Sequence, residues 1–120
     1  MNLRYFHINE FDSPDLPGSG EEMKSSTLKM LDTARHLAKV PFSINSGFRT
    51  KKHNKKVGGK SDSSHLYGFA VDISCTDSMS RFKILRALVD VGFTRIGIGK
   101  GFIHVDNDPN KPQEVVWNYY

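Results

Sequence analysis

The sequence predicts an α+β fold, in which helices pack on a small, mostly antiparallel sheet. Two stretches, residues 22–40 and 79–91, carry apolar side chains at helical spacing. In residues 69–74 (FAVDIS), the large apolar side chains of Phe69, Val71 and Ile73 alternate with small or polar ones, which is the period of a strand. Two more short strands are predicted around Gly99–Gly101, because this glycine-flanked segment favours a tight hairpin.

The N-terminal half is expected to form one helix and one strand. Residues 1–20 are predicted to be irregular, because DSPDLPGSG contains two prolines and two glycines. The first helix follows, with Ser19 or Ser25 as its cap, and ends at Pro41. Residues 42–49 (FSINSGFR) are predicted as a strand, and residues 50–62 as a basic loop with one helical turn.

The C-terminal half is expected to contribute the second helix and three strands. The strand 69–74 comes first, and the second helix follows, capped by Asp77 or Ser78 and ended by Gly92. Strands at 95–99 and 101–106 complete the predicted sheet. The tail ends in the apolar sequence VVWNYY, which we expect to pack back on the core.

Length and composition restrict the class of protein. A chain of 120 residues with net charge +4 is expected to be one domain, 1–120, with a core of its own. One cysteine excludes an internal disulfide. No apolar run approaches the roughly 18 residues of a membrane span. The N-terminus lacks the apolar stretch of a secretory signal, so we expect no signal peptide. The protein is also expected to be a monomer without a membrane span.

Three residues have the spacing of an incomplete metal site. His65 lies just before the strand that carries Asp72, and His104 shares one face of strand 101–106 with Phe102 and Asp106. If the two strands are neighbours, His65, Asp72 and His104 can converge. Two imidazoles and a carboxylate are a standard ligand set for catalytic zinc. Spacing alone leaves open that these are ordinary loop and strand-end residues, and that Asp106 acts as a base or orients a ligand.

Sequence motifs resemble those of a known family. SSHLYGFAVD matches the Ser-x-His-x-x-Gly-x-Ala-x-Asp signature of the zinc D-Ala-D-Ala carboxypeptidase family through Ser63, His65, Gly68, Ala70 and Asp72. INSGFRTKKHNKKVGG resembles the family's Ser-Gly-Tyr-Arg segment followed by Asn and Val-Gly-Gly. GFIHVD resembles the segment of the last zinc histidine. The similarity covers residues 42–106. The family includes cell-wall carboxypeptidases and dipeptidases and phage L-alanyl-D-glutamate endolysins.

This resemblance implies a Hedgehog/DD-peptidase-like fold and a role for each matching residue. His65, Asp72 and His104 would bind Zn²⁺, and Arg49 would hold the substrate carboxylate or the developing oxyanion. Ser63 is expected either to contact a ligand or the substrate or to be an ordinary loop serine. Four aromatic residues are expected either to line a substrate groove or to belong to the core: Phe48, Tyr67, Phe102 and Trp117.

The general base departs from the family's pattern. Several members place it three residues before the last zinc histidine, where this chain has Gly101. Asp106 is the remaining carboxylate on the same face as His104, so we assign it this role. If Asp106 only orients a ligand, the base is unidentified.

The predicted function is zinc-dependent hydrolysis of peptide bonds in peptidoglycan stem peptides, of the D-Ala-D-Ala carboxypeptidase or the endolysin type. The missing signal and the small size indicate a phage or prophage protein, either an endolysin released through a holin pore or a module of a virion. It would act on the bacterial cell wall from the host cytoplasm or from the virion. A bacterial cytoplasmic dipeptidase fits the missing signal too.

Two interpretations from other classes remain. A non-catalytic zinc-containing cell-wall-binding module is favoured by Gly101. A nucleic-acid-binding domain would use the lysines of the basic loop and would bind less tightly at high salt. It leaves the two histidines and the aspartate unexplained, so we expect no nucleic-acid partner. These lysines are Lys51, Lys52, Lys55, Lys56 and Lys60.

Overall fold

The computed structural model describes residues 2–120, and its central feature is a five-stranded mixed sheet. The strand order is β1-β2-β4-β3-β5. Three of the four pairings are antiparallel and the last, between β3 and β5, is parallel. The strands are β1 (Ile44–Ser46), β2 (Ala70–Ser74), β3 (Arg95–Ile98), β4 (Phe102–Asp106) and β5 (Val115–Asn118).

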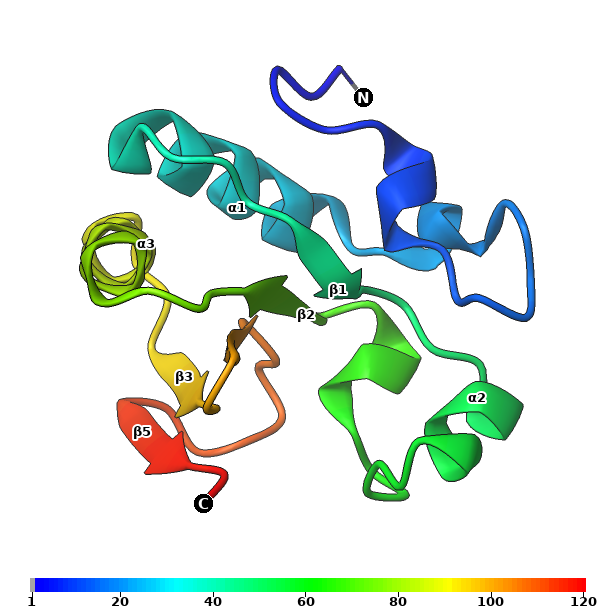
Figure 1. Ribbon diagram of the computed structural model, residues 1–120. Helices are drawn as coiled ribbons and strands as arrows, with labels where there is room; N and C mark the ends of the chain where they lie inside the picture. Colours follow the sequence, from blue (N-terminus) through cyan, green and yellow to red (C-terminus); the bar gives the residue numbers. More distant parts are fainter. Residues whose placement is uncertain (1) are drawn as a thin grey trace.

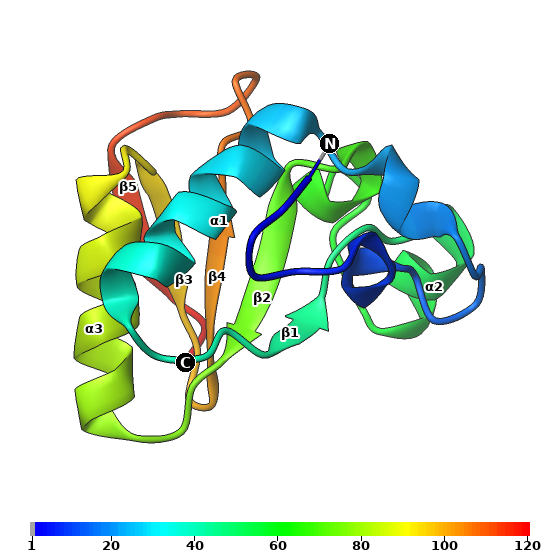
Figure 2. The same ribbon diagram turned by 90° about the horizontal axis from the view of Figure 1, so that it is seen from above.

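Two long helices, α1 (Ser25–Ala38) and α3 (Ser78–Asp90), pack against each other and cover one face of this sheet (Figures 1 and 2). The core between them and the strands contains Leu31, Leu88, Val71, Ile73, Ile103 and Val105. No helix among residues 2–120 is long and apolar enough to cross a membrane. This architecture confirms the predicted α+β fold with helices on a mostly antiparallel sheet.

Shorter helices lie at the opposite end of the sheet from α3 (Figure 2). They are α2 (Lys51–Lys56) and the 3₁₀ helices η1 (Ile8–Phe11), η2 (Ser19–Glu22) and η3 (Ser64–Tyr67). Of these only α2 was expected, as one helical turn in the basic loop. Its N-cap is Thr50, whose hydroxyl accepts a hydrogen bond from the His53 amide at 3.1 Å.

The first helix begins later than the sequence predicts. Its N-cap residue is Lys24, which makes no side-chain capping bond, so the prediction that Ser19 or Ser25 caps it was wrong. Residues 19–22 form η2 instead. The carboxylate of Asp12 explains this separate turn, because it accepts bonds from the amides of Gly18 (3.0 Å) and Gly20 (2.7 Å).

The C-terminal tail differs most from its prediction. Val115–Asn118 pairs in parallel with β3 and forms the edge of the sheet, whereas the tail was expected to pack on the core. Val116 is 69% exposed, so this side chain adds little to the core. A parallel edge strand has no local hairpin signal, which explains why the sequence did not reveal it.

Pairing between β2 and β4 positions the predicted ligands. Asp72 lies directly opposite His104, and Ala70 lies opposite Asp106. Ile103 and Val105, which alternate with His104 along β4, point into the core beneath the helices. The other face of β4 therefore carries Phe102, His104 and Asp106 away from the core, as the alternation of the sequence predicts.

Candidate metal centre

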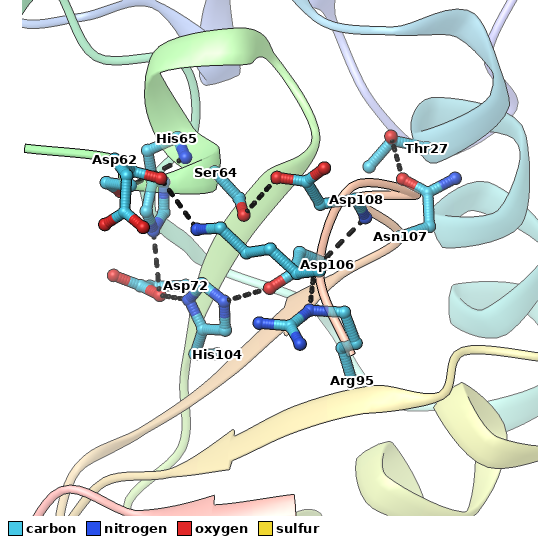
Figure 3. Close-up of polar contacts among 12 residues, drawn as sticks. Thr27, Asp62, Ser64, His65, Asp72, Arg95, His104, Asp106, Asn107 and Asp108 are labelled. Carbon is cyan, nitrogen blue, oxygen red and sulfur yellow. Dashed lines mark hydrogen bonds and ion pairs between the residues drawn. The ribbon is translucent and has the colours of Figure 1, made fainter. Parts of the chain in front are cut away.

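Three side chains from three separate elements converge on the uncovered face of the sheet (Figure 3). His65 comes from η3, Asp72 from β2 and His104 from β4. One donor atom from each lies within 4.8 Å of the other two. The two histidines are buried and the aspartate is partly exposed. The structure thus brings together the three residues that the sequence singled out as metal ligands.

His65 has one nitrogen available for a metal. Its Nδ1 lies 2.7 Å from the Gly47 carbonyl oxygen, which can only accept, so Nδ1 carries the proton and donates. Nε2 then keeps its lone pair and faces Asp72 Oδ1 at 3.3 Å. Burial lowers the pKa of His65 and favours this neutral form. A neutral imidazole is the form that binds zinc.

His104 lies between two carboxylates. Its Nδ1 is 2.9 Å from Asp72 Oδ1, and its Nε2 is 2.7 Å from Asp106 Oδ2. Burial opposes the charged ring, yet the bonds with Asp106 and Asp72 together raise the pKa of His104 above its usual value. The Nδ1 atom is the one on the side of the other two donors. A proton on Nε2, donated to Asp106, leaves Nδ1 free to bind a metal.

Asp72 completes the donor set as an ionised carboxylate. Burial acts to raise its pKa, but the close contacts with His104 and His65 hold the pKa of Asp72 well below its usual value. Oδ1 faces both histidines, and Oδ2 lies 3.1 Å from Arg49 Nη2. Two imidazole nitrogens and one carboxylate oxygen fit Zn²⁺ and leave a fourth position for water or substrate.

Asp106 is nearly inaccessible, with 1% of its surface exposed. Oδ2 accepts from His104, and Oδ1 accepts from Arg95 Nε at 2.7 Å and from the Asp108 amide at 3.1 Å. Burial opposes its charge, but the bond from His104 and these further donors lower the pKa of Asp106. Both carboxylate oxygens of Asp106 therefore already accept hydrogen bonds. Asp106 lies on the side of the His104 ring that faces away from Asp72 (Figure 3).

Arg95 was not predicted as a residue of the site, although the sequence contains a signal for it. A two-residue turn at Lys100–Gly101, within the predicted hairpin, pairs residue 95 with residue 106, and the structure has this pair. An arginine opposite an aspartate on neighbouring strands predicts an ion pair. Arg95 also donates to the Pro112 carbonyl at 2.5 Å and so connects the β4–β5 loop to the site.

Arg49 reaches the site from the segment after β1. Its guanidinium donates to Ser46 Oγ at 2.9 Å, Asn54 Oδ1 at 3.2 Å and Asp72 Oδ2 at 3.1 Å. Of its five N–H groups, these bonds leave two without a partner among residues 2–120. Asn54, the asparagine of the motif INSGFRTKKHNKKVGG, is buried and also donates to the Lys60 carbonyl at 2.8 Å. Arg49 is thus fixed in place with donors to spare.

A cavity of about 680 Å³ opens above the three ligands. Its lining includes Ser63, whose hydroxyl accepts a bond from the His65 amide at 3.2 Å. Phe102 and Trp117 also line it. Tyr67 and Phe48 lie in a neighbouring cavity of about 720 Å³, which shares Arg49 with the first. The structure therefore places Tyr67 outside the ligand cavity, and its role with substrate stays a prediction.

Comparison with known proteins covers the segment that builds this site. Residues 6–106 match the model of the peptidase M15 family. The chain is also similar to a zinc D-Ala-D-Ala carboxypeptidase from Streptomyces albus G, with 31% identity over 111 residues. That alignment covers 85% of this chain and 42% of the relative, so the chain spans less than half of the relative's length.

Proposed function

Because the chain belongs to the peptidase M15 family, we propose that it is a zinc-dependent peptidase that hydrolyses peptide bonds in peptidoglycan stem peptides. The three ligands all fall within the matched residues 6–106. Carboxypeptidase or endolysin specificity, a phage origin and action on the cell wall from the host cytoplasm or a virion are parts of the same proposal. So are the single domain and the monomeric state.

The convergence of His65, Asp72 and His104 carries this proposal. Their donor atoms come from three elements, and each of the three side chains is held by a further partner. Those partners are the Gly47 carbonyl for His65, the Arg49 guanidinium for Asp72 and the Asp106 carboxylate for His104. Ligands that are oriented in this way are typical of a metal site rather than of an ordinary ion pair.

Each residue of the cavity has a role in the proposed reaction. Zinc, when bound, supplies Lewis acidity for hydrolysis of an amide. Arg49 uses its spare N–H groups to bind a substrate carboxylate or the oxyanion that develops at the scissile carbonyl. Ser63 belongs to the cavity lining, where its hydroxyl can contact the peptide. Asp106 orients His104 and holds its proton on Nε2.

The orienting role of Asp106 makes a second function worth testing. Asp72 and Asp106 are the two carboxylates that line the cavity among residues 2–120, and both are occupied by other partners. Gly101 does not line the cavity and has no side chain to act as a base. A non-catalytic zinc-containing module that binds the cell wall would have these properties.

The basic residues suit an anionic wall polymer. Lys51, Lys52, Lys55 and Lys56 belong to α2, beside the cavity, and Lys60 lines it. Such charges raise the local concentration of an anionic substrate at low salt. A nucleic-acid partner would use the same residues and stays the weaker hypothesis, because it gives the metal ligands no role.

Incubation with peptidoglycan and with synthetic stem peptides tests the two candidates. We expect cleavage that a chelator abolishes and zinc restores, and the fragment masses will identify the bond. His104→Ala is the inactive control. One bound zinc per chain without cleavage of any stem peptide would contradict the peptidase and support the binding module.

A further inference from the structure

A second cavity, of about 720 Å³, adjoins the ligand cavity at Arg49. The two cavities have three lining residues in common, Arg49, Gly58 and Gly59. The rest of the lining of the second cavity comes mainly from α2, from the segment before it and from the end of η3, which packs beside α2 (Figure 1). The roles proposed above leave this space unused.

The two cavities meet over backbone that carries no side chains. A Cβ at Gly58 would have no atom within 4 Å beyond its chain neighbours, so this position faces open space. A Cβ at Gly59 would collide with Asn54 Oδ1 and come within 3.1 Å of Arg49 Nη1. A side chain at residue 59 would therefore displace the asparagine that holds Arg49. With glycine at both positions, no side chain of this segment blocks the way from the metal ligands past Arg49.

The second cavity is lined by cations. Lys51 and Lys55 lie one turn apart on α2 and both line it, together with Arg49. Among residues 2–120, no aspartate or glutamate belongs to this lining. Asp15, which accepts a bond from the lining residue Thr50 at 2.7 Å, lies outside it. Three cations without a carboxylate among them favour an anionic ligand.

An exposed aromatic ring lines the same cavity. Tyr67 is 56% exposed and does not belong to the hydrophobic core. Phe48 also lines the cavity, but it packs partly against the core. An aromatic ring that opens into a cavity gives a peptide an apolar surface to pack against. The ring and the cations together fit a peptide segment that carries a carboxylate.

We propose that the second cavity binds the part of the substrate that leaves on the carboxyl side of the cleaved bond, and that this part is a segment of two or more residues with a carboxylate of its own. The inference rests on the proposed peptidase function, in which Arg49 binds the substrate beside the cleaved bond. A single leaving residue ends at Arg49, whereas a longer segment continues past it. Lys51 and Lys55 then pair with the carboxylate of the segment, and Tyr67 packs against it.

Matched peptides test the second cavity through the kcat/KM of the zinc-loaded protein. All carry the same stem-peptide residues before the cleaved bond. The leaving part is a single residue, a three-residue amidated segment that contains glutamine, or the same segment with glutamate instead. We expect release of the glutamate segment to exceed release of the glutamine segment about tenfold. Lys51→Gln combined with Lys55→Gln should lower kcat/KM for the glutamate segment about threefold to tenfold and leave the single-residue peptide unchanged.

The same helix provides the matched control. Lys52→Gln combined with Lys56→Gln removes the same charge from α2, at two residues that line neither cavity. This control should keep the preference for the glutamate segment. An equal loss in both double variants would overturn the site, because the effect would then follow from net charge alone. Equal kcat/KM for the glutamate and glutamine segments would overturn it too.

Failure of the peptidase function has a different signature. The glutamate segment alone, labelled with a fluorophore at its carboxyl end, reports binding by fluorescence anisotropy whether or not any peptide is cleaved. Saturable binding that the first double variant weakens and the control does not, without cleavage of any peptide, would keep the site and remove the activity. Cleavage that neither double variant changes would keep the activity and overturn the site.

Discussion

The contacts that hold His104 come mostly from residues that are distant in the sequence, and Asp106 is the one sequence neighbour among them. Asp72 comes from β2, the ring of Trp117 comes from β5, and Asp106 is itself held by Arg95 of β3. A ligand fixed from several directions loses little freedom when it binds a metal, and this favours affinity. Asp106 is the closest of these supports, and its buried position argues that it orients the ring.

Zinc affinity distinguishes an orienting Asp106 from a general base. We expect Asp106→Ala to weaken zinc binding by about 10-fold to 100-fold, because His104 loses its fixed proton and orientation. Asp106→Asn keeps the volume and one acceptor oxygen, so its loss should be smaller. Competition with a chromophoric chelator measures both. Lost turnover with unchanged zinc affinity in both variants would identify Asp106 as a base instead.

Arg49 should act on substrate rather than on the metal. Arg49→Lys keeps the charge but loses the planar fork that contacts Ser46, Asn54 and Asp72 together. For peptides with a free carboxylate beside the cleaved bond, we expect KM to rise about tenfold or more. Zinc content, measured by metal analysis, should stay at that of the unmodified protein.

An exposed arginine provides the comparison for this variant. Arg86 of α3 pairs with Asp90 in an exposed ion pair, and neither residue lines the cavity. Arg86→Lys should therefore leave KM and zinc content unchanged. A fall in zinc content for Arg49→Lys alone would show that Arg49 serves mainly to hold Asp72.

The sequence predicted the elements that carry their own local signals. Alternation identified β2 and β4, the glycine-flanked hairpin placed β3 beside β4, and Asp77 marked the start of α3. The start of α1 and the existence of β5 were not found. The first depends on Asp12, which binds amides up to eight residues away, and the second on a parallel partner with no connecting turn.

The cap of α3 makes a titratable contribution to stability. Asp77 accepts a bond from the Ser80 amide at 2.9 Å, and this bond holds the pKa of Asp77 below its usual value. A carboxyl whose pKa is lower in the folded state stabilises the fold above its unfolded pKa. That contribution disappears as the pH falls through the folded pKa.

Thermal melts of Asp77→Asn and Asp77→Ala between about pH 7 and about pH 3 test this cap. Asparagine accepts the same bond without titrating, and alanine accepts none. We expect the native protein to melt above Asp77→Asn at neutral pH, with the difference lost at low pH. Asp77→Ala should melt below both at neutral pH. If the difference in Tm between the native protein and Asp77→Asn did not change with pH, the titrating cap would be refuted.

For the whole molecule, the sheet determines which distant residues meet. The motif around His65 and the alternation along β4 were enough to predict that His65, Asp72 and His104 meet, because each lies in a recognisable local pattern. Tyr119 could not be recognised in the same way. Its side chain reaches the cavity because β5 pairs with β3 at the edge of the sheet.

Because the three ligands belong to η3, β2 and β4, zinc should stabilise the fold as a whole. The unfolded chain holds no preformed site, so binding adds to the free energy of unfolding. Free zinc at about 100 times its Kd should add about 2.7 kcal/mol. For a domain of this size that corresponds to a rise in Tm of about 10 °C. Differential scanning calorimetry with zinc and with a chelator measures the shift.

Single-ligand variants determine whether this stabilisation comes from the proposed centre. His65→Ala and His104→Ala should each lose most of the zinc-dependent rise in Tm. His53→Ala should keep it, because His53 belongs to α2 and is no member of the donor set. An equal rise in all three variants would show that zinc binds elsewhere on the fold. If only His65→Ala and His104→Ala lose the zinc-dependent rise in Tm, the metal joins the segments that carry the ligands, in addition to the sheet.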